Sequence, residues 1–279
     1  MNGAPGASLS IPSNRGTTCD GQGFWTVDRY TQRLMADISV SVVVPWYPQD
    51  VRRVAAWAWL QARWEQLRPD WEIVTAESKP GVFNTAEAIN LGVTRASGDI
   101  VVVAYADTLI DNIWLDAVPL LSDGLIMVPM VCGNLGRFPT TDLIALEPDT
   151  DAPSPYANTV ESRQTLTWTG VCAAPRSMFE TIRFDERFDG WGHEGEAWLL
   201  AHETLGASIH RVGAAIHLWH PDRPEGTWGS HGADRRRWLY EAYVAAHEVQ
   251  DVHAMRRLCE LDRHHPRMIP RRDKRRFPQ

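Results

Sequence analysis

Carboxylates, aromatic rings and glycines are concentrated in residues 184–196, where the sequence reads FDERFDGWGHEGE. The glycines allow a tight turn, and such a turn can hold the rigid indole of Trp191 beside a carboxylate at the edge of a pocket. Acids are rarely buried without a partner, so this many acids around one indole are poorly explained by packing alone. We therefore expect a ligand-binding turn, with Glu194 and Glu196 among its candidate carboxylates. The structural alternative is a turn that only holds two halves of the fold together.

A further candidate acid, Asp107, follows the apolar run Ile100–Ala104 and the pair Tyr105-Ala106. An aspartate at the carboxyl end of a buried strand is well placed to hold a divalent cation, which would neutralise a diphosphate leaving group. The competing interpretation is that Asp107 only caps the next helix, since aspartate is common at such corners.

Two histidines lie further along the chain, in the sequence His217-Leu-Trp-His220-Pro. Imidazole nitrogen is a good ligand for ions such as Mn²⁺, and a strand or turn could aim one of the two rings at a metal. The alternative is a hydrogen-bonded histidine at a strand end with a purely structural role.

Short motifs in the first half of the chain occur in a defined order: Pro45 at the end of an apolar run, AxNxG at residues 88–92 and AxGD at residues 96–99. Together they resemble the nucleotide-binding half of family-2-type glycosyltransferases of the GT-A fold. The resemblance implies a nucleoside-diphosphate sugar as co-substrate, with a UDP-sugar as the default, and Mn²⁺ or Mg²⁺ as cofactor.

The same resemblance implies roles for individual residues. In that family the strand equivalent to 100–104 ends in a DxD motif, so Tyr105 replaces the first acid and Asp107 matches the metal-contacting one. The acidic turn after the second strand is altered to Ala76-Glu77-Ser78, and Glu77 is the nearest candidate to contact the base. A surface acid is the alternative for Glu77. The remaining residues that we expect in the donor site are Pro45, Tyr47, Asn90 and Tyr105.

The pattern FDxxFxGWGxE resembles the acceptor-side segment of β-1,4-galactosyltransferases and polypeptide N-acetylgalactosaminyltransferases. The resemblance implies that Trp191 and Gly192 shape the sugar pocket. Inverting relatives place a general base directly after the glutamate, where this chain has Gly195, and retaining relatives also lack an acid there. This favours retention, while Glu194 or Glu196 as the base of an inverting site stays open.

In the N-acetylgalactosaminyltransferases a histidine completes the metal site, and His217 matches it. His220 falls where that family has an arginine that contacts the diphosphate, and Arg223 could supply the displaced positive charge.

The hydrophobic pattern predicts an α/β fold with a mostly parallel central sheet flanked by helices and a C-terminal helical extension. The resemblance implies that this fold is of the GT-A, Rossmann-like type. Ligands of such sheets bind at the carboxyl ends of the strands. We expect strands at 38–45, 71–75, 100–104, 125–131, 165–173 and 208–216, and helices at 50–67, 86–96, 114–121, 194–205 and 235–258. The polar, proline-containing stretch 137–163 is expected to be a long loop.

The 279 residues are 44% hydrophobic, enough for one large core. We expect a flexible leader and N-terminal extension at 1–37, a GT-A domain at 38–230, and a C-terminal helix with a basic tail at 231–279. The chain shows no apolar run of membrane-spanning length, and its first residues lack the apolar segment of a secretory signal. Four scattered cysteines fit reduced thiols, which predicts a cytoplasmic protein.

Charge is unevenly distributed along the chain, whose net charge is −7. Residues 256–279 hold nine Arg and Lys against three Asp and Glu, a net +6, which leaves −13 for the rest. This basic tail could contact an anionic partner, or it could be a solvated arm.

We therefore expect a metal-dependent glycosyltransferase whose acceptor is a protein, a glycan, a small molecule or modified DNA. The alternatives are a nucleotide-sugar-binding protein that has lost catalysis, and a glycosyltransferase that acts on modified nucleic acid.

Overall fold

The computed structural model describes residues 17–19, 25–27, 38–48, 51–80, 83–131, 170–188, 192–218 and 236–264. The chain divides into two compact units, Met1–Ile38 and Ser39–Gln279. In the first unit, β1 (Thr17–Cys19) pairs antiparallel with β2 (Trp25–Val27). All other elements belong to the second unit.

A seven-stranded sheet forms the centre of the second unit, with the strand order β4-β3-β5-β8-β7-β9-β6. Five strands run in one direction, and β6 and β8 run in the other. The mostly parallel sheet predicted from the sequence is therefore confirmed. The strands are β3 (Val40–Pro45), β4 (Glu72–Ala76), β5 (Ile100–Ala104), β6 (Thr108–Ile110), β7 (Leu125–Val131), β8 (Val171–Pro175) and β9 (Ser208–His217).

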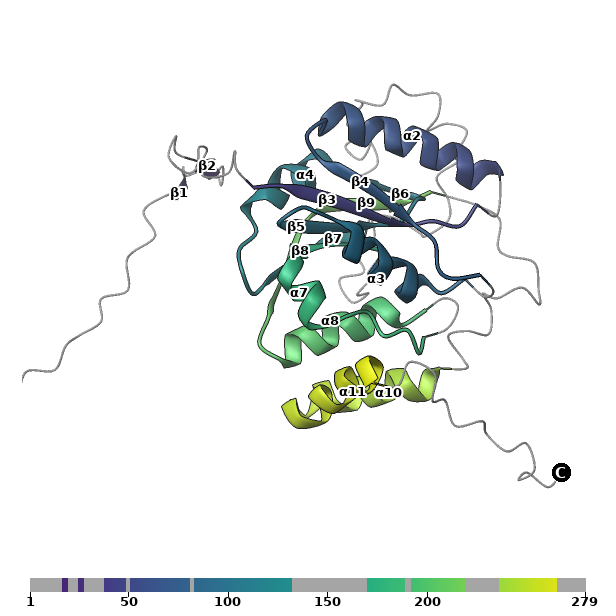
Figure 1. Cartoon of the computed structure of the whole chain (residues 1–279). Coiled ribbons are helices and arrows are strands. Elements are labelled where there is room, and N and C mark those ends of the chain that lie inside the picture. The colour runs from purple at the N-terminus through teal and green to yellow at the C-terminus, as the bar shows by residue number, and fades with distance from the viewer. Residues whose placement is uncertain are drawn as a thin grey trace, which may run out of the picture. The chain divides into compact units, whose positions relative to one another are not determined.

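Helices cover both faces of the sheet (Figure 1). Helix α2 (Val51–Leu67) lies over one face, and α3 (Thr85–Arg95), α7 (Arg176–Thr181) and α8 (Glu194–Thr204) lie over the other. A C-terminal pair, α10 (Arg237–Glu248) and α11 (Val252–His264), packs on α8 and forms the expected helical extension. The short helix α4 (Asn112–Ala117) continues into a 3₁₀ turn at Val118–Leu120. Among the described helices, none is long and apolar enough to cross a membrane.

The main core lies between the sheet and α3, α8 and α10. β-Branched residues of the strands, such as Val43 and Val103, are fully buried there. Stacked aromatic rings extend the core below the sheet, with the ring centroid of Trp198 4.8 Å from that of Phe179 and 5.1 Å from that of Phe184. This packing fixes the segment that leads into residues 184–188 against α8.

Close packing explains both glycines of the two nucleotide-side motifs. A Cβ atom on Gly92 would lie 2.3 Å from Cγ1 of Val43, so α3 can approach β3 only because this side chain is absent. A Cβ atom on Gly98 would lie 2.6 Å from the backbone nitrogen of Ser41. The motif glycines therefore have a structural function, whatever else they do.

Two sequence-based expectations and one competing interpretation are wrong. The helix expected at 235–258 is two helices, because the chain turns at Val249–Asp251, where Gln250 has a positive φ of 52°. The helix expected at 114–121 starts at Asn112 and gives way to the 3₁₀ turn containing Pro119. Asp107 does not cap a helix: strand β6 follows it, and the side chain of Asp111 caps α4 by accepting from the backbone N–H of Trp114 at 2.8 Å.

Strand β6 and helix α7 were not expected from the sequence. Both are short, with three and six residues, so their hydrophobic pattern is too brief to recognise. The loop expected at 137–163 lies outside the described residues, as do Asp50 and the first five residues of the strand expected at 165–173.

Candidate functional site

The carboxyl ends of β3, β4 and β5 lie along one edge of the sheet, because the three strands are parallel and in register. Pro45 is paired with Ala76, and the backbone N–H of Trp46 donates to the carbonyl of Ala76 at 2.8 Å. Glu77 follows directly and is exposed. The exposed ring of Tyr47 stacks on Phe83, with centroids 5.2 Å apart. Four predicted donor-site residues therefore share this edge: Pro45, Tyr47, Glu77 and Tyr105.

A hydrogen bond joins this edge to the turn before α8. The hydroxyl of Tyr105 donates to Oε1 of Glu194 at 2.9 Å, and the backbone N–H of Gly192 donates to Oε2 of the same carboxylate at 2.8 Å. Glu194 is 3% exposed. Both carboxylate oxygens thus have a partner, and the GxE turn is tied to the end of β5.

Burial sets the ionisation behaviour of this pair. It raises the pKa of Glu194 above its ordinary value of 4.5 because the ionised form loses hydration. Burial, followed by the nearby charge of Glu194, raises the pKa of Tyr105 well above its ordinary value. The phenol therefore stays protonated and is a donor to the carboxylate at neutral pH.

The turn itself has unusual backbone geometry. Gly192 has φ of 110°, and His193 has φ of 69°, a left-handed conformation that costs energy in a non-glycine residue. Beyond it, Nδ1 of His193 lies 3.0 Å from Oε2 of Glu196, and the His193 ring stacks on Tyr240 of α10 with centroids 4.1 Å apart. Burial and the charge and hydrogen bond of Glu196 raise the pKa of Tyr240. Glu196 therefore contacts the C-terminal helices, whereas Glu194 faces Tyr105.

Asp107 follows Tyr105 by two residues and is 3% exposed. Its Oδ2 forms an ion pair with Nε of Arg53, at 3.2 Å, and Arg53 belongs to the first turn of α2. The pairing of β6 with β9 sets His217 opposite Thr108, and the backbone N–H of Leu218 donates to the carbonyl of Asp107 at 2.7 Å. The main chain of His217 is thus adjacent to that of Asp107.

The fit of this corner to a divalent cation depends on its side chains. Carboxylate oxygen and imidazole nitrogen are ligands that Mn²⁺ accepts, but the guanidinium of Arg53 already forms an ion pair with Asp107. Within the described ranges, no three His, Cys, Asp or Glu side chains form a cluster that could hold a metal, so an ion here would need ligands from the donor or from other residues.

Asn90 has a different environment from the one expected. Its buried side chain donates to the carbonyl of Phe184 at 2.8 Å and accepts from the backbone N–H of the same residue at 3.0 Å. It also donates to Oε1 of Glu186 at 3.0 Å. In the structure, the Asn90 amide joins α3 to the start of the 184–196 segment.

A buried polar cluster that sequence reasoning missed lies behind this segment. The carboxylate of Asp185, 3% exposed, is paired with the guanidinium of Arg187 and accepts from the hydroxyl of Tyr243 at 3.0 Å. Arg187 also donates to the carbonyl of Leu258 in α11 at 2.8 Å. The DER sequence gave no signal for this role, because surface segments have the same composition.

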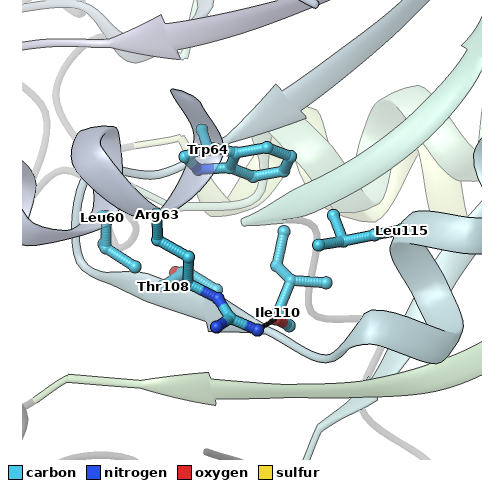
Figure 2. Close-up of a pocket in the computed structure, with 6 residues that line it drawn as sticks. All are labelled: Leu60, Arg63, Trp64, Thr108, Ile110 and Leu115. Carbon is cyan, nitrogen blue, oxygen red and sulfur yellow. Dashed lines mark hydrogen bonds between the residues drawn. The ribbon is translucent and has the colours of Figure 1, made fainter. Parts of the chain in front are cut away.

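A small cavity of about 10 Å³ lies between α2, β6 and α4 (Figure 2). The side chain of Arg63 points across it toward the strand, with Nη2 2.9 Å from Oδ1 of Asn112. Such a volume holds no more than one water molecule, so this cavity is not a nucleotide site. Its lining residues are Leu60, Arg63, Trp64, Thr108, Ile110 and Leu115.

Three predicted site residues, Trp191, His220 and Arg223, lie outside the described residues, and so does the side chain of His217. Their expected roles stay predictions.

No family model and no curated protein matches the chain. Among solved structures, it is similar to glucosyl-3-phosphoglycerate synthase from Mycobacterium tuberculosis in complex with Mn²⁺, UDP-glucose and glycerol 3-phosphate. The TM-score is 0.43 and the identity 16%, over 84% of this chain and 85% of that chain. It is also similar to a mutant of Drosophila β-1,4-galactosyltransferase 7 in complex with manganese, UDP-Gal and xylobiose.

For the galactosyltransferase the TM-score is 0.41 and the identity 16%, over 62% of this chain and 64% of that chain, which is less than two thirds of its length. By name, the first of these proteins is a synthase and the second is a galactosyltransferase. Because the identities and TM-scores are low, the functional assignment below rests on the residues and geometry of this chain.

Proposed function

We propose that this protein is a glycosyltransferase that moves a sugar from a nucleoside-diphosphate sugar to an acceptor hydroxyl. The observation that carries the proposal is the hydrogen bond between Tyr105 and Glu194. It joins the end of a central strand, the expected donor side, to the GxE turn, the expected acceptor side, at the edge of the sheet where ligands of such folds bind. Neither half alone would support a transfer reaction.

Asp107 and His217 are the residues that would hold a divalent cation, Mn²⁺ or Mg²⁺, in this account. When bound, the ion neutralises the charge that develops on the diphosphate leaving group. The main chain of His217, which pairs with Thr108, lies next to that of Asp107, and this adjacency supports the assignment.

The donor would lie along the edge formed by β3 and β4. Tyr47 offers an exposed aromatic face near the strand end, and Glu77 offers an exposed carboxylate next to it. Uridine is the first base to test. We assign Trp191, Gly192, His220 and Arg223 to the sugar and diphosphate, and Asn90 to positioning the 184–196 segment rather than to direct contact.

Retention of configuration is the outcome that the site geometry favours. Both oxygens of Glu194 already accept hydrogen bonds, and Glu196 is held by His193, so neither is presented as a general base toward an acceptor. The negative charge of Glu194 can instead stabilise the positive charge that develops on the sugar in the transition state. Slow hydrolysis of the donor, followed by proton NMR before mutarotation, should yield the same anomer as the donor; the opposite anomer would exclude this assignment.

The direct test of the proposal is a panel of sugar nucleotides incubated with the protein and Mn²⁺, with thermal shift reporting binding and nucleotide release reporting turnover. Asp107→Asn should weaken donor binding, because it removes the charge of the expected metal ligand, whereas Asp116→Asn on the exposed surface should not. If no sugar nucleotide binds or is consumed, the proposal is wrong.

A second candidate function is a nucleotide-sugar-binding protein without catalysis. Tyr105 in place of the first acid and Arg53 against Asp107 favour it, since both reduce the negative charge available to a metal. Donor binding without any nucleotide release, even with a broad acceptor panel, would select this function.

The acceptor we propose to test in addition is modified nucleic acid, motivated by the basic tail. We propose a cytoplasmic location, because Cys172 and Cys259 are both free thiols.

A further inference from the structure

We propose that Tyr240 of α10 is a positioning residue of the candidate site, which holds His193 in its left-handed conformation. That conformation directs the backbone N–H of Gly192 to Oε2 of Glu194. This role rests on the proposed function and deepens it, since it concerns the carboxylate that we place at the reacting centre. It also gives the C-terminal helical extension a defined task at the site, through one side chain.

The backbone of His193 sets the position of the Gly192 N–H. His193 has φ of 69° and ψ of −13°, and no side-chain hydrogen bond caps α8 at this residue. Because His193 is the only residue between Gly192 and Glu194, rotation about its φ or ψ moves the N–H away from the carboxylate, which lies 2.8 Å from it. A left-handed conformation is costly in a residue that has a Cβ atom, so it persists only where surrounding contacts hold it.

Glu196 and Tyr240 hold the His193 ring. Nδ1 of His193 lies 3.0 Å from Oε2 of Glu196, and because a carboxylate only accepts hydrogen bonds, Nδ1 carries the proton. The ring of Tyr240 stacks on the imidazole, with centroids 4.1 Å apart and planes inclined by 11°. The Tyr240 hydroxyl also forms a hydrogen bond with Glu196, so Tyr240 contacts both members of the pair.

Helix α10 is itself fixed by buried side chains on either side of Tyr240. Leu239 is fully buried, and Tyr243, which is 3% exposed, donates to Oδ2 of Asp185 at 3.0 Å. The helix also packs against α8, the helix that His193 precedes. Tyr240 therefore presents its ring to His193 from a defined place in the fold.

The Gly192 N–H matters to the charge of Glu194. It is the donor to Oε2, as the hydroxyl of Tyr105 is to Oε1, and a buried carboxylate that loses a donor is less stable in its ionised form. When Tyr240 no longer holds His193, we expect the Gly192 bond to weaken and the carboxylate to be less firmly placed. A Tyr240 with a purely structural role would change stability alone, whereas a positioning residue changes turnover.

The test compares Tyr240→Leu, which removes the stacking and the hydrogen bond, with Tyr240→Phe, which keeps the ring and removes only the hydroxyl. Trp238→Leu is the matched control, because Trp238 belongs to the same helix and is 50% exposed. The first readout needs no substrate: it is hydrogen exchange of the Gly192 amide, followed by NMR. We expect exchange about tenfold faster than in the wild type for Tyr240→Leu, an intermediate rate for Tyr240→Phe and no change for Trp238→Leu.

The second readout is nucleotide release, with UDP-glucose as the probe donor. For Tyr240→Leu we expect kcat to be about tenfold lower with KM unchanged, because the donor side is intact and only the Glu194 carboxylate is misplaced. Tyr240→Phe should recover part of this loss, and Trp238→Leu should match the wild type. If Tyr240→Leu does not fold, Tyr240→Phe keeps the stacked ring and provides both readouts.

The two readouts separate this role from the proposed function. Equal Gly192 exchange in the wild type and the Tyr240 variants would overturn the role of Tyr240 and leave the proposed function intact, and so would a loss of kcat that Trp238→Leu shares. If the wild type releases no nucleotide from UDP-glucose or from any other member of the sugar-nucleotide panel, the proposed function fails instead. The amide exchange of Gly192 then still decides whether Tyr240 holds the turn.

Discussion

Tyr105 and Glu194 are the two residues on which the site depends most. The phenol stands where the related motif has an acid, and its hydroxyl is directed to a carboxylate 89 positions later in the chain. The hydrogen bond between Tyr105 and Glu194 can form only after the sheet and α8 have packed together. Its presence therefore shows that these two parts of the candidate site are assembled.

Removal of the Tyr105 hydroxyl tests this pair at the residue scale. Tyr105→Phe leaves the buried Glu194 carboxylate without one of its two hydrogen bonds, which we expect to lower the free energy of unfolding by about 1–3 kcal/mol. Tyr47→Phe is the control, because that side chain is exposed and keeps its ring. Urea denaturation measures both; equal effects of the two substitutions would argue against a buried, functional hydrogen bond.

Glu194 should also make stability depend on pH. Its pKa is raised in the folded protein, so the folded state binds the proton more tightly than the unfolded chain does. The resulting stabilisation is fully present below the unfolded value of 4.5 and is lost as pH rises through the folded pKa. Glu194→Gln lacks this pH-dependent stabilisation because its amide does not titrate. The hydrogen bonds with Tyr105 and Gly192 can persist, since the phenol oxygen can accept from the amide.

The stability of Glu194→Gln relative to the wild type should therefore increase as pH rises above 4.5. Urea denaturation of both proteins across a pH series measures this difference. A difference that is constant with pH would show that Glu194 titrates normally in the folded protein.

At the scale of elements, the C-terminal helices contribute to the site without lying in it. Helix α10 supplies Tyr240 to the His193–Glu196 pair and Tyr243 to Asp185, so the segment 184–196 is held from behind by α10 and α11. This arrangement indicates that the helical extension is part of the same structural unit as the sheet.

Asp185→Ala tests that anchor. It removes the carboxylate that pairs with the mostly buried guanidinium of Arg187, and we expect a loss of about 3–5 kcal/mol in the free energy of unfolding. Asp116→Ala breaks an ion pair with Arg68 in which the carboxylate is 73% exposed, and it should cost no more than about 1 kcal/mol. Similar losses for both variants would mean that the C-terminal helices are not anchored through Asp185.

The elements that could be predicted from the sequence are those with long, regular patterns. The run Ile100–Ala104 became β5 with the expected boundaries, and α2, α3, α8 and β7 lie within a residue or two of expectation. The break at Gln250 escaped prediction, since glutamine does not signal a positive φ. Strand order could not be read either, because it depends on packing between distant segments.

The same limit applies to the site. Residue type and order singled out Asp107, Glu194 and the neighbourhood of His217. They did not indicate that Arg53 pairs with Asp107 or that Arg187 contacts α11, because both contacts join segments brought together only by the fold.

For the whole molecule, we propose that the sheet and its helices form the catalytic unit over 38–230 and that residues 231–279 support it. The basic tail defined from the sequence begins at residue 256, but helix α11 extends to His264 and its Met255 is fully buried. A truncation that removes the tail should therefore leave α11 intact. The segment to remove is therefore 265–279, which holds six Arg and Lys against one Asp.

Deletion of residues 265–279 should leave the thermal stability unchanged, because it leaves α11 whole. If the tail binds an anionic partner, the intact protein should shift a short DNA duplex in a gel at low salt, and the truncated protein should not. A salt-sensitive shift that survives the deletion would exclude the tail as the binding element.

The central claim is that Glu194 lies at the reacting centre of a glycosyl transfer. The measurement that tests it most directly is the rate of nucleotide release from the donor by Glu194→Gln and by the wild type, with donor binding measured on the same samples. We predict that the variant binds the sugar nucleotide with an unchanged dissociation constant and releases nucleotide at least about 100-fold more slowly, since it lacks the charge that stabilises the transition state. Equal rates in the two proteins would contradict the account.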